Sequence, residues 1–295
     1  MLNSNIANDT TGIMEFPLQL AAEVQRNVLA ALAEDLGGGD LTALLSPASK
    51  RSLGTVVSRE DAVLSGTAWF DSCFRRLDAL TDIRWNLRDG DIIRAGETVC
   101  EIEASTRALL SAERAALNFL QLLSATATAT RLYVDAVAGT GARIVDTRKT
   151  LPGLRLAQKY AVTCGGGKNH RLGLYDGILI KENHIIAAGG VTAALQQARA
   201  IGRNDVFIQI EVETLEQLAE AIDADARMIL LDNMDLAQMR QAVGLTAGRA
   251  ELEASGGVSL ETVRAIAETG VDRISIGGLT KNVRAVDLSL RHSEG

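Results

Sequence analysis

Apolar residues near the start of the chain recur with the period of a helix. Within residues 17–35 they stand at positions 18, 21, 24, 28 and 32, which predicts one buried face of an amphipathic helix. The glycine-rich segment 36–40 ends this helix. Residues 106–138 also predict helix, in two pieces with an Ala- and Thr-rich middle at 124–130.

Between these helices the sequence predicts a small antiparallel sheet. Residues 53–64 and 83–103 have the composition of strands, and Gly-containing pairs mark turns at 89–90 and 95–96. The second segment resembles the hairpins of lipoyl- or biotinyl-type modules. It has no lysine at a hairpin tip, so we do not expect a swinging-arm role.

From residue 143 onward, short apolar runs alternate with helical patterns, which is typical of parallel β/α architecture. The expected strands are 143–147, 177–181, 206–213, 228–233, 252–257 and 273–278. The expected helices are 153–162, 190–201, 214–224, 235–243 and 259–269, with a short final helix at 282–291. Six strands are fewer than the eight of a full barrel, and the boundary between the two modules falls near residue 140.

Composition excludes several classes of function. The 295 residues are 47% hydrophobic and carry a net charge of −7, which argues against a basic nucleic-acid-binding surface. No run approaches the roughly 18 apolar residues that a membrane span needs, and residues 1–14 lack the blocks of a signal peptide. The three cysteines show neither metal spacing nor a disulfide framework. We therefore expect a cytoplasmic protein that binds neither nucleic acid nor membrane.

Positive charge is concentrated in residues 148–182, where seven Lys and Arg side chains meet only two acids. The basic residues are Arg148, Lys149, Arg155, Lys159, Lys168, Arg171 and Lys181, and the acids are Asp176 and Glu182. An acidic protein that gathers cations in one stretch is expected to bind a small anionic ligand there. A glycine triplet at 165–167 within this stretch predicts a flexible loop.

Every predicted parallel strand ends in charged or glycine-rich residues. In chain order these ends are residues 146–149, Lys181, Glu211 with Glu213, Asp232 with Asn233, residues 255–257, and Gly277 with Gly278. In β/α barrels this end of the strands forms the active-site face. One such end is commonly structural, but cations buried together without counter-charge cost several kcal/mol per ion. Six charged or glycine-rich strand ends in succession therefore favour a ligand that supplies negative charge.

The acids and glycines at these ends suggest separate roles. Glu211 and Asp232 are oxygen ligands on neighbouring strands, suited to Mg²⁺ held together with substrate phosphates and water. Glu213 could compete for this role, and pairing of an acid with Lys149 or Lys181 is the structural alternative. Backbone N–H groups of the glycine pairs could bind phosphate. For His170 we favour donation to a carboxylate over a general-base role, and a solvated loop histidine is the alternative.

The segment 146–185 resembles the family of quinolinate phosphoribosyltransferases, also called nicotinate-nucleotide pyrophosphorylases (carboxylating). Shorter matches extend the resemblance over nearly the whole chain after residue 15, at 34–42, 111–124, 210–217, 230–234, 253–258 and 274–280. The resemblance implies phosphoribosyl transfer from phosphoribosyl pyrophosphate to quinolinate, with Mg²⁺ and no organic cofactor. The products would be nicotinate mononucleotide, CO₂ and pyrophosphate, in NAD biosynthesis.

The resemblance also implies an α/β fold class. Residues 1–138 would form an N-terminal α/β sandwich and helical dimerisation domain. Residues 139–281 would form a catalytic domain, an incomplete six-stranded parallel β/α barrel. Residues 282–295 would be a C-terminal helix that packs back on the N-terminal domain.

The same resemblance assigns site residues and a homodimer in which Arg114 enters the partner's site. Arg148, His170 and Arg171 match quinolinate contacts. Lys149 matches a group close to both substrates, and Lys181, Glu211 and Asp232 match groups around the ribose, pyrophosphate and metal. These four would be the catalytic residues, with Glu211 and Asp232 near Mg²⁺. The remaining matches to substrate contacts are Thr147, Ser255, Gly256, Gly257, Ser275, Gly277 and Gly278.

Three alternatives stay open at this point. A pyrophosphorylase-like protein encoded with molybdate transporters resembles this family and shares much of the 147–171 pattern. A Schiff-base aldolase would use Lys181 at a strand end. A non-catalytic protein that binds a phosphorylated metabolite would need no metal-binding acids.

Overall fold

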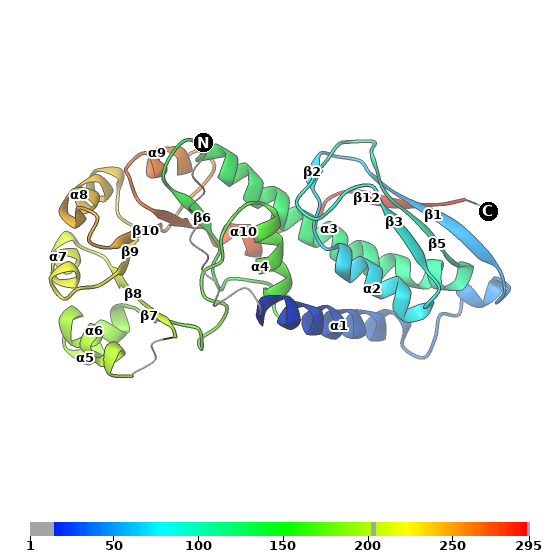
Figure 1. The fold of residues 1–295 in the computed structure, drawn as a ribbon, viewed down its shortest axis with the longest axis horizontal. Helices are drawn as coiled ribbons and strands as arrows, with labels where there is room; N and C mark the ends of the chain where they lie inside the picture. The colour runs from blue at the N-terminus through cyan, green and yellow to red at the C-terminus, as the bar shows by residue number, and fades with distance from the viewer. Residues whose placement is uncertain (1–14, 202–204, 294–295) are drawn as a thin grey trace, which may run out of the picture.

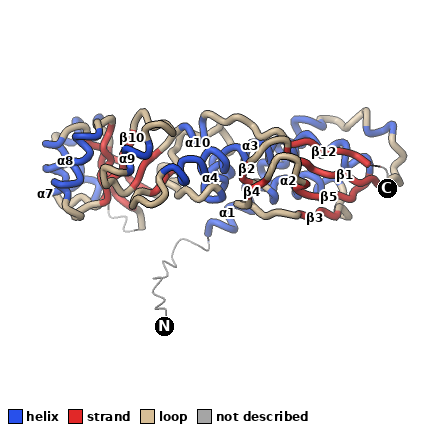
Figure 2. The backbone as a smooth tube through the Cα atoms, turned by 90° about the horizontal axis from the view of Figure 1, so that it is seen from above, coloured by secondary structure: helices blue, strands red, loops and turns tan. Residues whose placement is uncertain are grey.

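The computed structural model describes residues 15–201 and 205–293, which form two parts joined by a long helix (Figure 1). The parts lie end to end in an elongated molecule, with an antiparallel sheet at one end and a parallel sheet at the other (Figure 2). Among the described residues, no helix is both long enough and apolar enough to cross a membrane.

The N-terminal part is an α/β sandwich built on an antiparallel sheet of order β12-β1-β5-β3. Its strands are β1 (Arg51–Ser58), β3 (Asp82–Trp85), β5 (Thr98–Ser105) and β12 (Leu288–Ser293). Its helices are α1 (Glu15–Leu36), α2 (Thr67–Leu77) and α3 (Thr106–Ala136). The short elements are the 3₁₀-helix η1 (Ala43–Leu45) and the paired strands β2 (Ala62–Val63) and β4 (Ile92–Ile93). Helix α2 was not expected from the sequence.

Alternation along β1 shows how this sheet meets its helices. Ser52, Gly54 and Val56 are buried, whereas Leu53 between them is exposed. Such two-residue alternation gives a strand one face toward the core. A Cβ on Gly54 would lie 3.2 Å from a side-chain carbon of Leu109 on α3, so the glycine lets the long helix approach the sheet closely.

Helix α3 is continuous, so the prediction of two helical pieces over 106–138 is wrong. In its Ala- and Thr-rich middle, the hydroxyls of Thr126, Thr128 and Thr130 donate to carbonyl oxygens four residues earlier. Hydroxyls that bond within their own helix need no separate partner, so this polar stretch can be buried. The small side chains let α2 and the barrel helix α4 (Arg155–Cys164) pack against α3.

The last element is a strand, so the predicted helix at 282–291, and with it the C-terminal helix over 282–295, is wrong. Strand β12 pairs with β1 in antiparallel register. Leu288 and Leu290 are buried, whereas Arg291 is exposed, as expected for a strand with one covered face. Strand β12 therefore completes the sheet of the N-terminal part.

The second part is an incomplete barrel of six parallel strands, which confirms the expected fold class. The strand order is β6-β11-β10-β9-β8-β7, and every neighbouring pair is parallel. The strands are β6 (Arg143–Val145), β7 (Gly177–Ile180), β8 (Phe207–Val212), β9 (Met228–Asp232), β10 (Glu251–Ser255) and β11 (Arg273–Ser275). Strands β6 and β7 are the edges of this sheet, so the barrel is not closed.

Helices cover the outer side of the barrel strands (Figure 1). In addition to α4, they are α5 (Glu182–Ala188), α6 (Val191–Ala200), α7 (Leu215–Asp223), α8 (Leu236–Thr246), α9 (Val263–Ala267) and α10 (Gly278–Lys281). Helix α4 joins the two parts, because Ala157 and Ala161 belong to the apolar core of the N-terminal part. The hydroxyl of Tyr160 on the same helix donates to Asp89 Oδ2 at 2.7 Å.

The two faces of the barrel sheet have opposite chemistry. Toward the helices the strands present a continuous apolar set that includes Ile144, Ile210, Val212, Ile229, Leu231, Leu252, Ala254 and Ile274. The alternate positions are largely polar or charged and include Gln209, Glu211, Asp232, Glu253, Ser255, Arg273 and Ser275. Successive residues of a strand point to opposite faces, so the concave interior of the barrel carries the polar set.

The glycine triplet predicted to be a flexible loop is a packed segment. A Cβ on Gly165 would lie 2.4 Å from the carbonyl oxygen of Ala127, and one on Gly167 would lie 2.8 Å from Thr130 Cγ2. Glycine is required here because the segment lies directly against α3. The triplet therefore fixes the position of the loop that follows it.

Candidate active site

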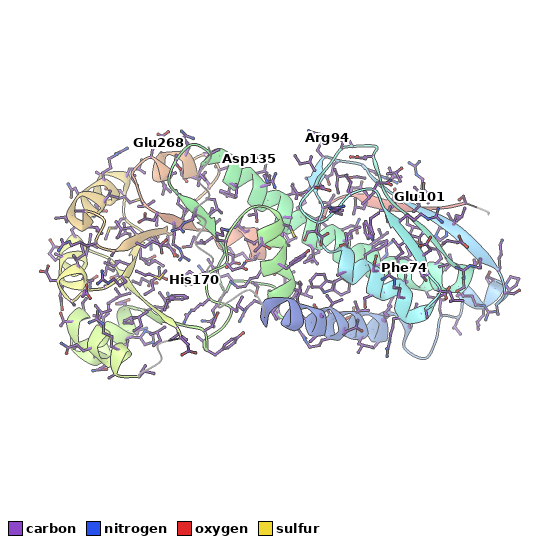
Figure 3. The ribbon with its side chains drawn as sticks, viewed as in Figure 1. Phe74, Arg94, Glu101, Asp135, His170 and Glu268 are labelled. Atoms are coloured by element: carbon purple, nitrogen blue, oxygen red, sulfur yellow. The ribbon has the colours of Figure 1, made fainter. Side chains whose placement is uncertain are left out.

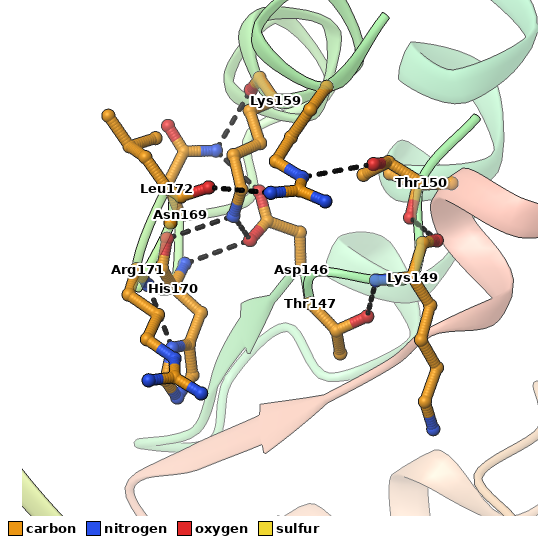
Figure 4. Close-up of polar contacts among 12 residues, drawn as sticks. Asp146, Thr147, Lys149, Thr150, Lys159, Asn169, His170, Arg171 and Leu172 are labelled. Carbon is orange, nitrogen blue, oxygen red and sulfur yellow. Dashed lines mark hydrogen bonds and ion pairs between the residues drawn. The ribbon is translucent and has the colours of Figure 1, made fainter. Parts of the chain in front are cut away.

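The end of β6 and the loop after α4 are held together by a buried ion pair between Asp146 and Lys159 (Figure 4). Both side chains are fully buried. The Asp146 carboxylate also accepts the backbone N–H of His170 at 2.9 Å and the side-chain amide of Asn169 at 2.6 Å. Lys159 Nζ donates to the carbonyl oxygen of His170 at 2.9 Å. This pair fixes the backbone from which Arg171 projects.

The pair also shows that one cation of the basic stretch is internal. Burial raises the pKa of the Asp146 carboxyl, and the charge of Lys159 opposes that shift. Burial lowers the pKa of the Lys159 ammonium, and the charge of Asp146 opposes it. Lys159 therefore serves the scaffold rather than a ligand.

Arg148 and Arg171 are two neighbouring cations that form no ion pair with a described carboxylate, although the charge of Asp176 acts on Arg171. In the described parts of the chain, neither guanidinium has a carboxylate oxygen within 4.0 Å. The Nε of Arg148 is buried and has no hydrogen-bond partner within residues 15–201 and 205–293. Burial, followed by the charge of Arg148, lowers the pKa of Arg171. Two guanidinium groups close enough to repel each other are suited to bind a ligand with two carboxylates.

One contact orients the Arg171 side chain. Its guanidinium donates to the carbonyl oxygen of Gly177 at 3.0 Å, which anchors it beside the start of β7. The carboxylate of Asp176 accepts the backbone N–H groups of Leu172 and Gly173 instead of the guanidinium. The remaining donors of Arg171 therefore stay available for a ligand.

Lys149 and Thr147 lie against the glycine pair that follows β11. A Cβ on Gly277 would lie 3.0 Å from Lys149 Cδ and 3.4 Å from Thr147 Oγ1. Thr147 Oγ1 accepts the backbone N–H of Lys149 at 3.1 Å, and Thr280 Oγ1 donates to the carbonyl oxygen of Lys149 at 2.7 Å. The ends of β6 and β11 are thus in contact, and the exposed Lys149 side chain extends from that junction.

Lys181 and Glu211 form an ion pair at the ends of β7 and β8, with Nζ and Oε2 2.7 Å apart. The alternative in which an acid pairs with a lysine therefore holds for Glu211. The Lys181 side chain is half exposed, whereas Glu211 is largely buried. Glu213, the competing acid, is exposed.

Asp232 and the loop after β10 lie next to this ion pair. Glu211 pairs in register with Leu230, two residues before Asp232, so both acids face the barrel interior. The Asp232 carboxylate accepts the side-chain amide of Asn233 at 3.0 Å. Register also places Asp232 opposite Ser255, and Ser255 opposite Ser275. These polar groups form one continuous row.

Gly256 allows the loop after β10 to approach Asn233. A Cβ at this position would lie 2.0 Å from Asn233 Oδ1. Gly256 also has a φ of 105°, and Gly257 has a φ of 59° with open space around its Cα. Only glycine combines such backbone angles with such a contact. The loop thus leaves room at the strand ends where phosphate binding is expected.

His170 lies inside the barrel, away from solvent (Figure 3). Its Nε2 is 2.8 Å from Gln209 Oε1, and its Nδ1 accepts the backbone N–H of Arg171 at 2.7 Å. The ring meets Phe207 edge to face with centroids 5.6 Å apart. The solvated-loop alternative is therefore wrong, and the direct quinolinate contact stays a prediction.

Sequence reasoning missed the polar residues that lie beneath His170. Gln209 Nε2 donates to Glu253 Oε2 at 3.1 Å, and Arg273 Nε lies 3.1 Å from the same oxygen. The signal was present in the strands, because 209, 253 and 273 share the inward alternation of 211, 255 and 275.

Arg114 is the one expected site residue that lies apart from the strand ends. It is exposed and lines a pocket of about 380 Å³ between α1, α3 and residues 152–154. Among the described residues, no three His, Cys, Asp or Glu side chains gather to hold a metal by themselves.

With this geometry in view, family models match almost the whole chain. The model of the quinolinate phosphoribosyl transferase C-terminal domain matches residues 126–291, and that of the N-terminal domain matches residues 40–124. The chain is 42% identical over 257 residues to a Bacillus subtilis (strain 168) protein named "Probable nicotinate-nucleotide pyrophosphorylase (carboxylating)". That alignment covers 87% of this chain and 89% of the relative.

A plant relative and a solved structure agree. The chloroplastic nicotinate-nucleotide pyrophosphorylase (carboxylating) of Arabidopsis thaliana is 39% identical over 281 residues, covering 88% of this chain and 80% of the relative. The nicotinate-nucleotide pyrophosphorylase structure from Francisella tularensis superposes with a TM-score of 0.90 at 41% identity, covering 92% of this chain and 97% of that one. The chain therefore belongs to the quinolinate phosphoribosyltransferase family.

Proposed function

We propose that this enzyme transfers the phosphoribosyl group of phosphoribosyl pyrophosphate to quinolinate and releases pyrophosphate and CO₂. The product is nicotinate mononucleotide, a precursor of NAD. The observation that carries the proposal is the pair Arg148 and Arg171, two partly buried guanidinium groups without a carboxylate partner among the described residues. Quinolinate brings two adjacent carboxylates, which this pair would bind.

The remaining strand ends suit the second substrate. Lys149 beside Gly277 and the open loop at Gly257 surround a space where phosphate groups would meet a cation and backbone N–H groups. Lys181 would exchange part of its pairing with Glu211 for the leaving pyrophosphate. Glu211 and Asp232 would then face the ribose, where positive charge develops as the C1–O bond breaks.

Positioning and electrostatics account for the chemistry. The arginines hold the pyridine ring so that its nitrogen reaches ribose C1 as pyrophosphate leaves. The resulting pyridinium accepts the electron pair released when the 2-carboxylate departs as CO₂, and a proton then replaces it on the ring. This step needs no organic cofactor.

The acidic side chains fit Mg²⁺ held jointly with substrate. Two carboxylates, Glu211 and Asp232, face the same side of neighbouring strands. Mg²⁺ commonly binds through one or two carboxylates plus substrate phosphates and water, so a site without three clustered acids suits it. When bound, the ion would neutralise charge on the leaving pyrophosphate.

We propose in addition that the enzyme is a homodimer in which Arg114 serves the partner's site. Support comes from an exposed apolar segment near Arg114, where Leu41, Leu44 and Leu45 are 82%, 61% and 87% exposed. Leu110, one helical turn before Arg114, is also exposed. Contiguous exposed leucines mark interaction surfaces, and a second copy would cover them while it receives Arg114.

Substitution of Arg148 tests the proposed function. Arg148→Ala should raise the KM for quinolinate at least about 100-fold, since it removes a charged double hydrogen bond, and leave the Kd of phosphoribosyl pyrophosphate within about threefold. Arg155→Ala is the matched control, because Arg155 bonds Thr150 and Leu172 on the scaffold. Nicotinate mononucleotide formation and calorimetric binding measure both effects. Unchanged quinolinate affinity in Arg148→Ala would refute the assignment.

Three further outcomes would favour the alternative functions. Borohydride trapping of Lys181 with carbonyl compounds would support a Schiff-base aldolase. Binding of phosphoribosyl pyrophosphate without turnover would support a non-catalytic protein. Failure to use quinolinate, with another acceptor accepted, would favour the molybdate-associated relative.

A further inference from the structure

The polar groups inside the barrel form a chain that starts at Arg273 and ends at the Arg171 backbone. In order, Arg273 contacts Glu253, Glu253 accepts from Gln209, Gln209 contacts His170, and His170 accepts from Arg171. The side chains of Gln209, Glu253 and His170 are buried. No step of the proposed reaction uses Gln209, Glu253 or Arg273.

The chain of contacts leaves a single arrangement of hydrogens. A carboxylate only accepts hydrogen bonds, so the amide NH₂ of Gln209 must face Glu253 and its oxygen must face His170. The proton of the ring must then lie on Nε2. At the other nitrogen, the backbone N–H of Arg171 requires Nδ1 to be an acceptor. Both ends therefore fix the same neutral tautomer.

Charge within the barrel favours that tautomer as well. Glu253 Oε1 has no hydrogen-bond partner among the described residues and lies 3.8 Å from His170 Nε2. A negative oxygen on this side stabilises a proton on Nε2 rather than on Nδ1. The edge contact with Phe207 limits rotation of the ring. His170 is therefore held in one orientation.

We propose that Gln209 and Glu253 are positioning residues that, through His170, set the place of Arg171 in the quinolinate site. The inference rests on the proposed function, since it assigns Arg171 to quinolinate. It predicts that substitutions in this hydrogen-bond chain weaken quinolinate binding. The binding of phosphoribosyl pyrophosphate should not change, because its proposed contacts lie at the other strand ends.

Four variants test this proposal. Gln209→Leu keeps a similar volume and removes both hydrogen bonds. Gln209→Glu sets two carboxylates against each other. The double variant Gln209→Glu with Glu253→Gln reverses the direction of that bond at unchanged net charge, and it removes the carboxylate that faces Arg273. Leu230→Met is the control, because Leu230 is a buried neighbour on the same inner face, between Glu211 and Glu253 in register.

Steady-state kinetics should separate the two substrates. Gln209→Leu and Gln209→Glu should each raise the KM for quinolinate about tenfold, the effect of one well-placed hydrogen bond. The KM for phosphoribosyl pyrophosphate should stay within about twofold. The double variant should recover only part of the loss, since Arg273 then lacks its carboxylate, and Leu230→Met should match wild type. Equal changes in the KM of both substrates, or an unchanged KM for quinolinate in Gln209→Leu, would overturn the proposal.

A spectroscopic measurement tests the arrangement of hydrogen bonds at His170 independently of activity. With three histidines in the chain, ¹⁵N-histidine labelling and long-range ¹⁵N–¹H correlation at pH 8 give one pattern per ring, and His170→Asn assigns the relevant one. The expected pattern is the Nε2–H tautomer. A ring protonated at Nδ1 would overturn the proposal, even if the enzyme uses quinolinate. If wild type does not use quinolinate, the proposed function fails while the tautomer result still stands or falls by itself.

Discussion

At the scale of single residues, some polar side chains of the site lack hydrogen-bond partners in the described protein, whereas others have all the partners they need. Arg148 has a buried nitrogen without a hydrogen-bond partner in the described part of the chain, whereas Lys159 contacts both a carboxylate and a carbonyl oxygen. An unpaired buried donor costs about 1–3 kcal/mol. A ligand that satisfies it recovers this free energy on binding.

Gly256 is a residue whose replacement should act on one substrate. Gly256→Ala introduces a Cβ 2.0 Å from Asn233 Oδ1 at a φ of 105°, so the loop and the amide that holds Asp232 must shift. The KM for phosphoribosyl pyrophosphate should rise at least about tenfold, as expected for a displacement that costs 1–3 kcal/mol. Isothermal calorimetry should show unchanged quinolinate binding.

Gly248→Ala is the matched control for that variant. Gly248 also has a left-handed φ, of 76°, but nothing lies within 4 Å of a Cβ there. It should lose some stability and keep both KM values. A normal KM for phosphoribosyl pyrophosphate in Gly256→Ala would contradict the placement of this loop at the phosphates.

His170 predicts a pH dependence of stability. Burial, the largest cause, lowers its pKa below the ordinary value of 6.5. As the pH falls below about 6.5, the unfolded chain takes up a proton that the folded ring resists, so stability present above this pH is lost toward acid. Urea unfolding at pH 5 to 8 should therefore show a shallower acid slope in His170→Asn. A slope identical to wild type would be inconsistent with a buried neutral ring.

The residues that sequence could supply are those at strand ends. Arg148, Lys149, Lys181 and Asp232 each follow an apolar run, and a charge there is visible without a structure. Gln209 was not recognised, because a polar residue inside a strand signals function only once the partners across the barrel are known. The partners of Gln209 are His170 and Glu253, which are distant in sequence. Contacts of this kind cannot be predicted from the sequence alone.

At the scale of elements, the clearest departure from expectation is β12. Val286, Leu288 and Leu290 alternate with polar residues, a pattern that also fits a strand. A lone short segment cannot be assigned to a sheet without its partner, and β1 lies near the opposite end of the chain. The six barrel strands were recognisable because helical patterns separate them, whereas α2 and α5 were not predicted.

Leu290→Ala tests the contribution of this strand to stability. Leu290 is 9% exposed and belongs to the core of the N-terminal part, so truncation should lower the free energy of unfolding by about 2–4 kcal/mol. Arg291→Ala, the next residue with an exposed side chain, should change it by less than about 0.5 kcal/mol. Urea denaturation followed by circular dichroism measures both. Equal effects would indicate that β12 does not bury its inner face.

At the scale of the whole molecule, the proposed dimer predicts complementation between two inactive variants. Arg114→Ala and Arg171→Ala should each lose activity, because each removes a proposed quinolinate contact from every site. In a mixed dimer, one site carries both substitutions and the other carries neither, so purified heterodimer should regain about half of the wild-type activity per dimer. Two differently tagged chains, co-expressed and purified through both tags, provide that species. Absence of recovery would argue against a shared site.

The position of β12 has a consequence for synthesis on the ribosome. The antiparallel sheet contains both β1 and β12. The sequence of the barrel is therefore inserted within the sequence of the N-terminal part. While the ribosome makes the barrel, β1 keeps one edge open. Domains form as units during translation where their sequence is contiguous, so the barrel can consolidate first. The part that emerges earliest is then the last to close, because β12 is made after the whole barrel.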